Sequence, residues 1–202
     1  MSGGRPAILA VVATALLIGI GASLILDPRD AKAAVDTGVL LEDLDGNGLE
    51  PLNVIAARAH VIVFTTVDCP IANAYWPELR SIANDARGLE VRFFFVHVDP
   101  DVDAEVARTH ARDYACPGTI LLDPRHELVA ALGVTITPEV VVVLPGGRVA
   151  YQGRIDNLYG DLGRKRLSAT THELRDVLDQ IRHGTSVTVP WEKAVGCYVP
   201  EI

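Results

Sequence analysis

The sequence predicts an α/β domain with a mixed β-sheet covered by helices on both faces, behind a long apolar segment. In the first half of the domain, short β-branched and aromatic runs alternate with amphipathic segments, which is the pattern of strands joined by helices. Two later strands follow each other directly across Pro145-Gly146-Gly147, which predicts a hairpin. A chain of 202 residues is expected to form one domain of ordinary size.

Six strands are expected from runs of apolar, β-branched residues bounded by turn residues. They cover residues 39–44, 60–66, 90–98, 119–122, 139–144 and 148–152. The Asp-Gly-Asn-Gly sequence at 45–48 marks a turn after the first strand. The polar, glycine-containing stretch 153–169 predicts a loop, because it is too long for a tight turn.

Four helices are expected from apolar residues that recur at helical spacing. They cover residues 71–86, 103–114, 125–132 and 171–183, with Asp103 as the cap of the second and Thr170 or Thr171 as the cap of the last. Pro77 is expected to kink the first helix. Glycines and prolines in the tail after residue 183 predict an extended, mobile segment that does not pack into the sheet.

The segment that precedes the domain predicts a location outside the cytoplasm. Residues 6–26 carry no charge and would span roughly 30 Å as a helix, which matches the bilayer core. The sequence therefore predicts an uncleaved membrane anchor, and the alternative is a signal peptide cleaved near Ala31-Lys32-Ala33. The expected organisation is an anchor or signal with a linker at 1–34, a domain at 35–183 and a tail at 184–202. The domain would be periplasmic or on the cell surface, or secreted if the segment is cleaved.

The composition excludes some partners. The net charge is -8, whereas nucleic-acid binding requires a basic face. The sequence also lacks a glycine-rich phosphate loop. We therefore expect no nucleic-acid partner and no cofactor.

Cys69 is the residue on which the functional prediction depends. It lies between the strand at 60–66 and the helix that begins near Pro70. The backbone N–H groups and the dipole at a helix N-terminus favour negative charge, and a thiolate is the reactive form of cysteine. The neighbouring carboxylate of Asp68 would oppose ionisation unless it points away. The alternative is a buried cysteine that acts as a small hydrophobic residue.

Three landmarks, in this order and spacing, resemble the thioredoxin-like superfamily. Cys69 follows the first core strand, Pro77 lies eight residues further on, and Thr137-Pro138 precedes the strand at 139–144. A helix and a strand between residues 98 and 134 are similar to the insertion of the redoxin branch (alkyl hydroperoxide reductase/thiol-specific antioxidant). The resemblance covers about residues 37–183. It implies a thioredoxin-like fold, a cis-proline at 138, and Thr137 presenting its backbone to substrate.

The sequence also departs from the patterns of this superfamily. Cys69-Pro70-Ile71-Ala72 lacks the second cysteine of a Cys-x-x-Cys site. Thr66 and Cys69 supply the Thr-x-x-Cys of peroxiredoxins, in which the threonine bonds the thiolate, but Ile62 stands where their proline belongs. For the peroxidatic arginine of that family, the candidates are Arg148 and Arg154.

The resemblance also suggests redox partners for Cys69. An odd number of cysteines leaves at least one thiol free or transiently paired. Some peroxiredoxins carry a resolving cysteine near the C-terminus, as Cys197 is here, and others carry one in the region of Cys116. Both remain candidates, and so do a structural Cys116–Cys197 bond and an external thiol.

We therefore expect a thiol-based redox protein in which Cys69 attacks a peroxide or a protein disulfide, with an unspecified thiol as electron donor. One alternative is a non-catalytic thioredoxin-fold binding module. Another is a copper-chaperone-like protein that uses His97, although such proteins carry a Cys-x-x-x-Cys motif absent here. No metal site is expected, since Val54 stands where a calcium loop beginning at Asp43 would need glutamate.

Overall fold

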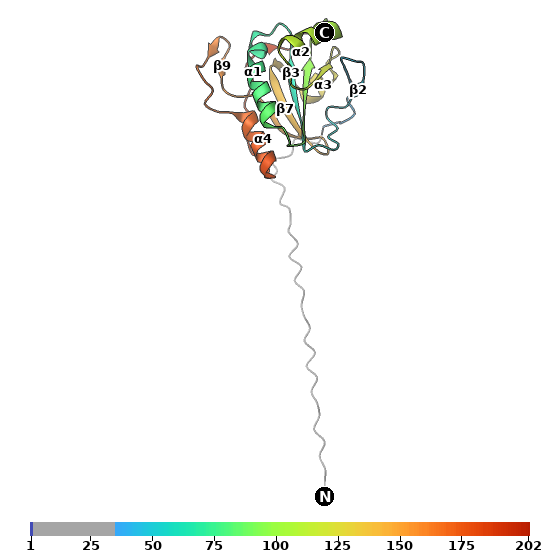
Figure 1. The fold of residues 1–202 in the computed structure, drawn as a ribbon, viewed down its shortest axis with the longest axis vertical. Coiled ribbons are helices and arrows are strands. Elements are labelled where there is room, and N and C mark those ends of the chain that lie inside the picture. The colour runs from blue at the N-terminus through green and yellow to red at the C-terminus, as the bar shows by residue number, and fades with distance from the viewer. Residues whose placement is uncertain (2–34) are drawn as a thin grey trace.

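A seven-stranded mixed sheet organises the protein (Figure 1). The computed structural model describes residue 1 and residues 35–202. The sheet has the order β2-β1-β5-β4-β3-β7-β8. Its strands are β1 (Leu41–Asp43), β2 (Gly48–Leu49), β3 (Ala59–Thr65), β4 (Val91–His97), β5 (Thr119–Leu122), β7 (Glu139–Leu144) and β8 (Arg148–Gly153). Strand β3 pairs in parallel with β4 and antiparallel with β7, so the sheet is mixed as predicted.

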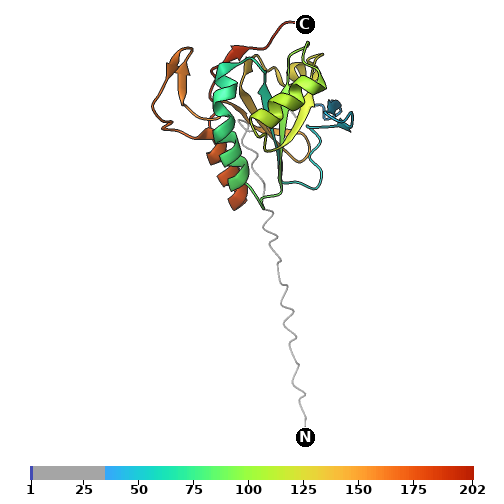
Figure 2. The same cartoon turned by 45° about the horizontal axis from the view of Figure 1, so that its top comes forward.

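Four helices and two small pairs of strands complete the described fold. The helices are α1 (Pro70–Asp85), α2 (Ala104–Asp113), α3 (Glu127–Leu132) and α4 (Glu173–His183). One pair joins β6 (Ile136–Thr137) to β11 (Cys197–Tyr198), and the other joins β9 (Tyr159–Asp161) to β10 (Arg164–Lys165). In Figure 2 the β9–β10 hairpin stands away from the body, on the side of α1 and α4.

The alternation of side chains along β3 explains the two-sided core. All seven residues of β3 are buried, so a continuous apolar run marks a central strand with both faces covered. Val61 and Val63 belong to the cluster that packs under α1, α2 and α4. Ile62 and Phe64 belong to the cluster on the other face, under α3.

All the predicted helices and strands are present, with ends shifted by a few residues, and three expectations were wrong. The stretch 153–169 contains the β9–β10 hairpin. Neither predicted threonine caps α4: its N-cap is His172, and the Thr171 hydroxyl instead donates to Glu173. The third wrong expectation is the mobile tail, which packs against the body, as described below.

Pro77, where a kink was predicted, lies inside α1, and the helix continues past it from Pro70 to Asp85.

The predicted membrane segment, residues 6–26, lies outside the described residues. Among the helices of residues 35–202, none combines the length and the apolar composition that crossing a bilayer requires.

Two buried histidines lie beside the loop that carries Cys69. The His97 ring is fully buried, 5.0 Å from the His110 ring, and neither of its nitrogens has a hydrogen-bond partner among the described residues. Nε2 of His110 donates to Asn73 Oδ1 at 2.8 Å, and Asn73 donates to Val67 O at 2.8 Å. Burial, with a smaller contribution from His110, lowers the pKa of His97 to about 3.

Protonation of His97 is expected to destabilise the protein at acidic pH. The folded pKa of about 3 lies below the ordinary value of 6.5, so between these values the unfolded chain binds more protons and stability falls as pH falls. At about pH 5 the cost is expected to be about 2 kcal/mol in the free energy of unfolding. We expect His97→Phe to flatten this acid dependence in urea unfolding of fragment 35–202.

His172→Phe is the matched control, because it replaces an exposed imidazole. It should keep the acid dependence of the parent. If the free energy of unfolding of His97→Phe depends on pH between about pH 5 and pH 8 as steeply as that of the parent, His97 is not the source of the acid dependence.

Candidate redox site

Cys69 is the N-cap of α1, as the sequence predicts. Its backbone is extended, with φ -77° and ψ 109°, and Pro70 occupies the first turn of the helix. The Sγ atom accepts a hydrogen bond from Ala72 N at 3.4 Å. A helix cap thus satisfies one of the free N–H groups of the first turn with a sulfur atom.

The loop before β7 brings a carbonyl group to the Cys69 thiol. The Thr137–Pro138 peptide bond is cis, which confirms the prediction. Cys69 Sγ donates to Thr137 O at 3.2 Å. Cys69 is only 1% exposed, although it lies at the N-terminus of α1. In this conformation the thiol is therefore held between the helix and the cis-proline loop.

The C-terminal tail brings Cys197 to the same place. Strand β11 pairs antiparallel with β6, and Cys197 lies opposite Thr137 in this pair. Cys69 Sγ donates to the carbonyl of the same Thr137, so the two cysteines lie side by side, and burial together with the neighbouring Cys69 thiol raises the pKa of Cys197 to about 12. Of the two candidate partners, the structure places Cys197 beside Cys69.

The tail is docked on the body between Glu192 and Val199, which corrects the expectation of a mobile segment. The Arg154 N–H donates to Glu192 O at 2.9 Å, and further on the Val199 N–H donates to Thr135 O at 3.0 Å. Ala194 is buried between these two bonds. The glycines and prolines of this segment are compatible with an extended chain that follows the surface of the body.

Cys116 lies toward the opposite end of the sheet. It follows α2, whose C-terminal carbonyl at Tyr114 accepts a hydrogen bond from Arg80 at 2.9 Å. Arg80 lies eleven residues after Cys69 on α1, which is about 16 Å along the helix axis. A disulfide requires Cα atoms within about 7 Å. A direct Cys69–Cys116 bond would therefore require a large rearrangement of the body.

The other predicted site residues have different surroundings. Thr66 is buried, and its hydroxyl is absent from the contacts that the described structure gives Cys69. Arg148 pairs with Leu144 at the end of β8 that is remote from the cis-proline loop. The Arg154 side chain forms an ion pair with Glu173 on α4. Neither arginine contacts Cys69 in the described structure.

Sequence reasoning assigned no structural role to the residues that follow β8; Arg154 was considered there only as a candidate peroxidatic arginine. Asp156 accepts a hydrogen bond from the Tyr75 hydroxyl at 2.7 Å, which ties this segment to α1. Burial and Asp156 raise the pKa of Tyr75, so it stays a neutral donor. Arg154 joins α4 through Glu173 and the tail through Glu192 O. These residues fix the positions of the tail, α1 and α4 relative to the end of β8. No local pattern in the sequence marks that role.

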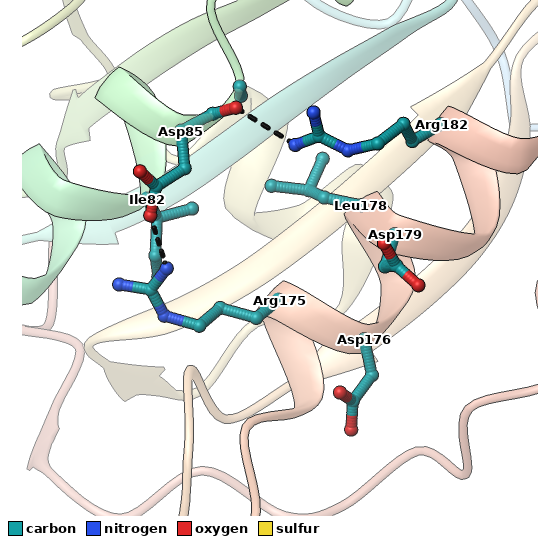
Figure 3. A pocket seen from close by; sticks show the side chains of 8 residues that line it. Ile82, Asp85, Arg175, Asp176, Leu178, Asp179 and Arg182 are labelled. Atoms are coloured by element: carbon teal, nitrogen blue, oxygen red, sulfur yellow. Dashed lines mark hydrogen bonds and ion pairs between the residues drawn. The ribbon is translucent and has the colours of Figure 1, made fainter.

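A pocket between α1 and α4 is remote from Cys69. Arg175 donates to the Asp85 carboxylate at 2.7 Å, and Arg182 donates to the Asp85 carbonyl at 2.8 Å (Figure 3). Ile82, which also lines it, lies thirteen residues after Cys69, about 20 Å along α1. The contacts in this pocket join the two helices.

The described residues contain one group of three potential metal ligands at suitable spacing. It consists of Glu78, Asp156 and His172 and includes neither Cys69 nor His97. Two of its members already bind protein groups, since Glu78 accepts from Arg175 and Asp156 accepts from Tyr75. The copper-chaperone-like alternative therefore gains no support from this group.

The fold and the site define a class: thioredoxin-fold proteins with a cysteine at the start of a core helix and a cis-proline loop opposite it. Residues 28–161 match the family model of the redoxins, which is more than half of the chain. The chain therefore belongs to the redoxin family, which confirms the resemblance found in the sequence. Among curated proteins, no match to this chain was found.

Solved structures show the same fold at low sequence identity. An uncharacterized conserved protein from Geobacillus kaustophilus is 21% identical with a TM-score of 0.71, over 84% of this chain and 93% of that one. A hypothetical protein from Sinorhizobium meliloti is 19% identical with a TM-score of 0.68, over 84% and 94%. StoA from Bacillus subtilis is 17% identical with a TM-score of 0.51, over 59% and 89%. At such identities the similarity shows the fold alone.

Cys116 is expected to be a poor nucleophile at neutral pH. Burial raises the pKa of its thiol to about 12. In a Cys69→Ser/Cys197→Ser variant, iodoacetamide at about pH 8 should modify Cys116 at least about 100-fold more slowly than a free cysteine, because the thiolate fraction falls about tenfold per pKa unit.

The same variant unfolded in urea is the control, and it should react at the rate of a free thiol. A pH–rate midpoint near 8.5 in the folded variant would contradict the effect of burial.

Proposed function

We propose that this protein is a thiol-based oxidoreductase in which Cys69 is the nucleophile and Cys197 is the second thiol of a redox pair. The observation that carries the proposal is that both cysteines meet at Thr137 of the cis-proline loop, since Cys69 Sγ donates to its carbonyl and Cys197 pairs opposite it. Cys-x-x-Cys sites place both cysteines on one helix, whereas here the second thiol comes from the C-terminal strand. The missing second cysteine after Cys69 is thus compatible with dithiol chemistry.

The surroundings of the two sulfurs differ, which supports their separate roles. The Ala72 N–H donates to Cys69 Sγ, and such a bond strengthens when the sulfur becomes negative. The raised pKa of Cys197 keeps that thiol protonated near neutral pH. Cys69 is therefore the thiol suited to the first attack, and Cys197 is suited to the second step.

With a disulfide substrate, the reaction is two successive exchanges. The Cys69 thiolate attacks one substrate sulfur, the substrate S–S bond breaks, and the other substrate sulfur leaves and takes a proton. Cys197 then loses its proton and attacks Cys69 Sγ, which releases the remaining substrate sulfur as a thiol. Two electrons pass from the cysteine pair to the substrate, and an external dithiol must reduce the Cys69–Cys197 bond.

With a peroxide substrate, the same pair gives the same oxidised product. The Cys69 thiolate attacks one peroxide oxygen, the O–O bond breaks, and water or an alcohol leaves with a proton. Cys197 then attacks the Cys69 sulfenic acid, and the hydroxyl group leaves as water. The peroxide gains two electrons, the cysteine pair loses two, and a dithiol again restores the reduced state.

A second candidate function is a binding module that uses the thioredoxin fold without redox chemistry. The 1% exposure of Cys69 favours it, because an inaccessible thiol does not react. The discriminating property is the behaviour of Cys69 toward oxidants.

We also propose that the domain works outside the cytoplasm, attached to the membrane by residues 6–26. The support is the uncharged length of this segment. An oxidising compartment suits a cysteine pair that alternates between thiols and a disulfide.

One equivalent of oxidant is expected to form the Cys69–Cys197 disulfide. Fragment 35–202 should be treated in parallel with hydrogen peroxide and with a small disulfide reagent, and the bonds mapped by peptide mass spectrometry. The Cys116→Ser variant should form the Cys69–Cys197 disulfide as the wild type does, because Cys116 lies too far from Cys69 to take part. Cys197→Ser should instead accumulate sulfenic acid or a mixed disulfide on Cys69.

The two reagents also separate the substrate classes. Oxidation by the disulfide reagent alone would exclude the peroxidase chemistry and keep the exchange chemistry. If neither reagent modifies Cys69, the redox function is wrong and the binding module remains.

The N-terminal segment is expected to stay on the mature protein and to hold it in the membrane fraction. Cells that express the full chain should be fractionated, and the N-terminus of the product should be sequenced. A soluble product that begins near Ala34 would instead identify a cleaved signal.

A further inference from the structure

We propose that residues 196–199 form a latch that closes over Cys69, and that Gly196 is the positioning residue that allows it to close. The inference rests on the proposed function, since it concerns access to the same cysteine pair. It adds that one short segment both delivers Cys197 and restricts what reaches Cys69.

The first observation is the close approach of Gly196 to the cis-proline loop. A Cβ atom at this position would overlap the carbonyl oxygen of Thr137. It would also lie 2.6 Å from the Thr137 carbonyl carbon and 3.0 Å from Pro138 N. All three are backbone atoms of a loop fixed between β6 and β7, so no flexible side chain can move aside. Any larger residue must push the strand off the loop.

The second observation is that the latch is held by a very short strand pair, β6–β11, with only two residues in each strand. Val199 N–H donates to Thr135 O at 3.0 Å, and Thr137 Oγ1 donates to Cys197 O at 3.5 Å. Val199 packs on the core cluster under α3, while Tyr198 is 78% exposed. A pair of two-residue strands outside the main sheet opens at lower cost than a central strand of that sheet.

The third observation is that the chain is anchored separately just before the latch. The Arg154 N–H holds Glu192 O at 2.9 Å, and Ala194 is buried. A Cβ on Gly153 would lie 3.1 Å from the Glu192 carbonyl carbon, so this part of the tail also lies close to β8. The latch can therefore open from residue 195 onward while the rest of the tail stays in place.

The consequence concerns the size of the reacting molecule. In the closed state Cys69 is 1% exposed, so a bulky reagent or a folded protein disulfide cannot reach its sulfur. In the open state Cys69 is accessible, but Cys197 is displaced from it. Closing after the first attack brings Cys197 to Cys69 and completes the exchange.

The test compares Gly196→Ala with Gly160→Ala in the full-length chain solubilised in mild detergent. A Cβ at Gly160 meets nothing nearer than the flexible end of Arg166 at 3.4 Å, so this variant controls for a glycine-to-alanine change. Access is measured in a Cys116→Ser/Cys197→Ser background as the rate at which a polyethylene-glycol maleimide modifies Cys69. Pair formation is measured with Cys197 present, as the rate of disulfide formation after one equivalent of a small disulfide reagent.

In Gly196→Ala, we expect the maleimide to modify Cys69 about tenfold faster than in the parent. We expect the Cys69–Cys197 disulfide to form about tenfold more slowly. Both changes follow because the added methyl group overpacks a backbone contact. Gly160→Ala should match its parent in both rates. A chain that ends at residue 195 adds no side chain and should show the same gain in Cys69 modification. Equal modification rates in parent, Gly196→Ala and truncated chain would overturn the latch.

The outcome is separable from that of the proposed function. If the parent protects Cys69 and both latch variants expose it, but no disulfide forms, the latch stands and the redox pair is wrong. If the disulfide forms at the same rate in parent and Gly196→Ala, the pair stands and the role of Gly196 is wrong. Unchanged circular dichroism and an unchanged melting temperature of the body would show that the variants fold.

Discussion

The site depends on one backbone carbonyl, that of Thr137. Cys69 Sγ donates to it at 3.2 Å, and Gly196 lies directly against it. This carbonyl lies just before Pro138 and the start of β7, while β3, the neighbour of β7, leads into the helix that carries Cys69. The sheet, the helix and the tail therefore meet at a backbone carbonyl and not at a reactive side chain.

Fixing the tail at this point requires support from distant parts of the chain. Arg154 binds the tail through its N–H and α4 through its guanidinium, and Asp156 binds Tyr75 on α1. Because these contacts are made by two residues that lie two positions apart just after β8, the end of one strand sets the relative positions of two helices and the C-terminal segment. A change there is expected to act on Cys69 indirectly, through the position of Cys197.

The sequence predicted the elements that local patterns specify. The buried run of β3 followed by Cys69 gave the strand, the helix N-terminus and the candidate nucleophile, and the Thr-Pro pair with its family resemblance gave the cis bond. The docking of the tail was missed because β6 and β11 have two residues each and pair across some sixty positions, so no propensity or periodicity marks them. Gly196 was taken as a sign of mobility, whereas its missing side chain permits a close contact.

Because the second thiol, Cys197, lies on a separate strand, the free energy of docking that strand affects how readily the disulfide forms. In a Cys-x-x-Cys site the two sulfurs stay adjacent whenever the helix is folded, so their effective concentration is fixed by local geometry. Here the adjacency of Cys69 and Cys197 depends on whether β11 is docked on β6, and each tenfold change in that equilibrium is about 1.4 kcal/mol. A few hydrogen bonds and the burial of Val199 supply energies of this size. The stability of a two-residue strand pair can therefore set how readily the cysteine pair forms its disulfide.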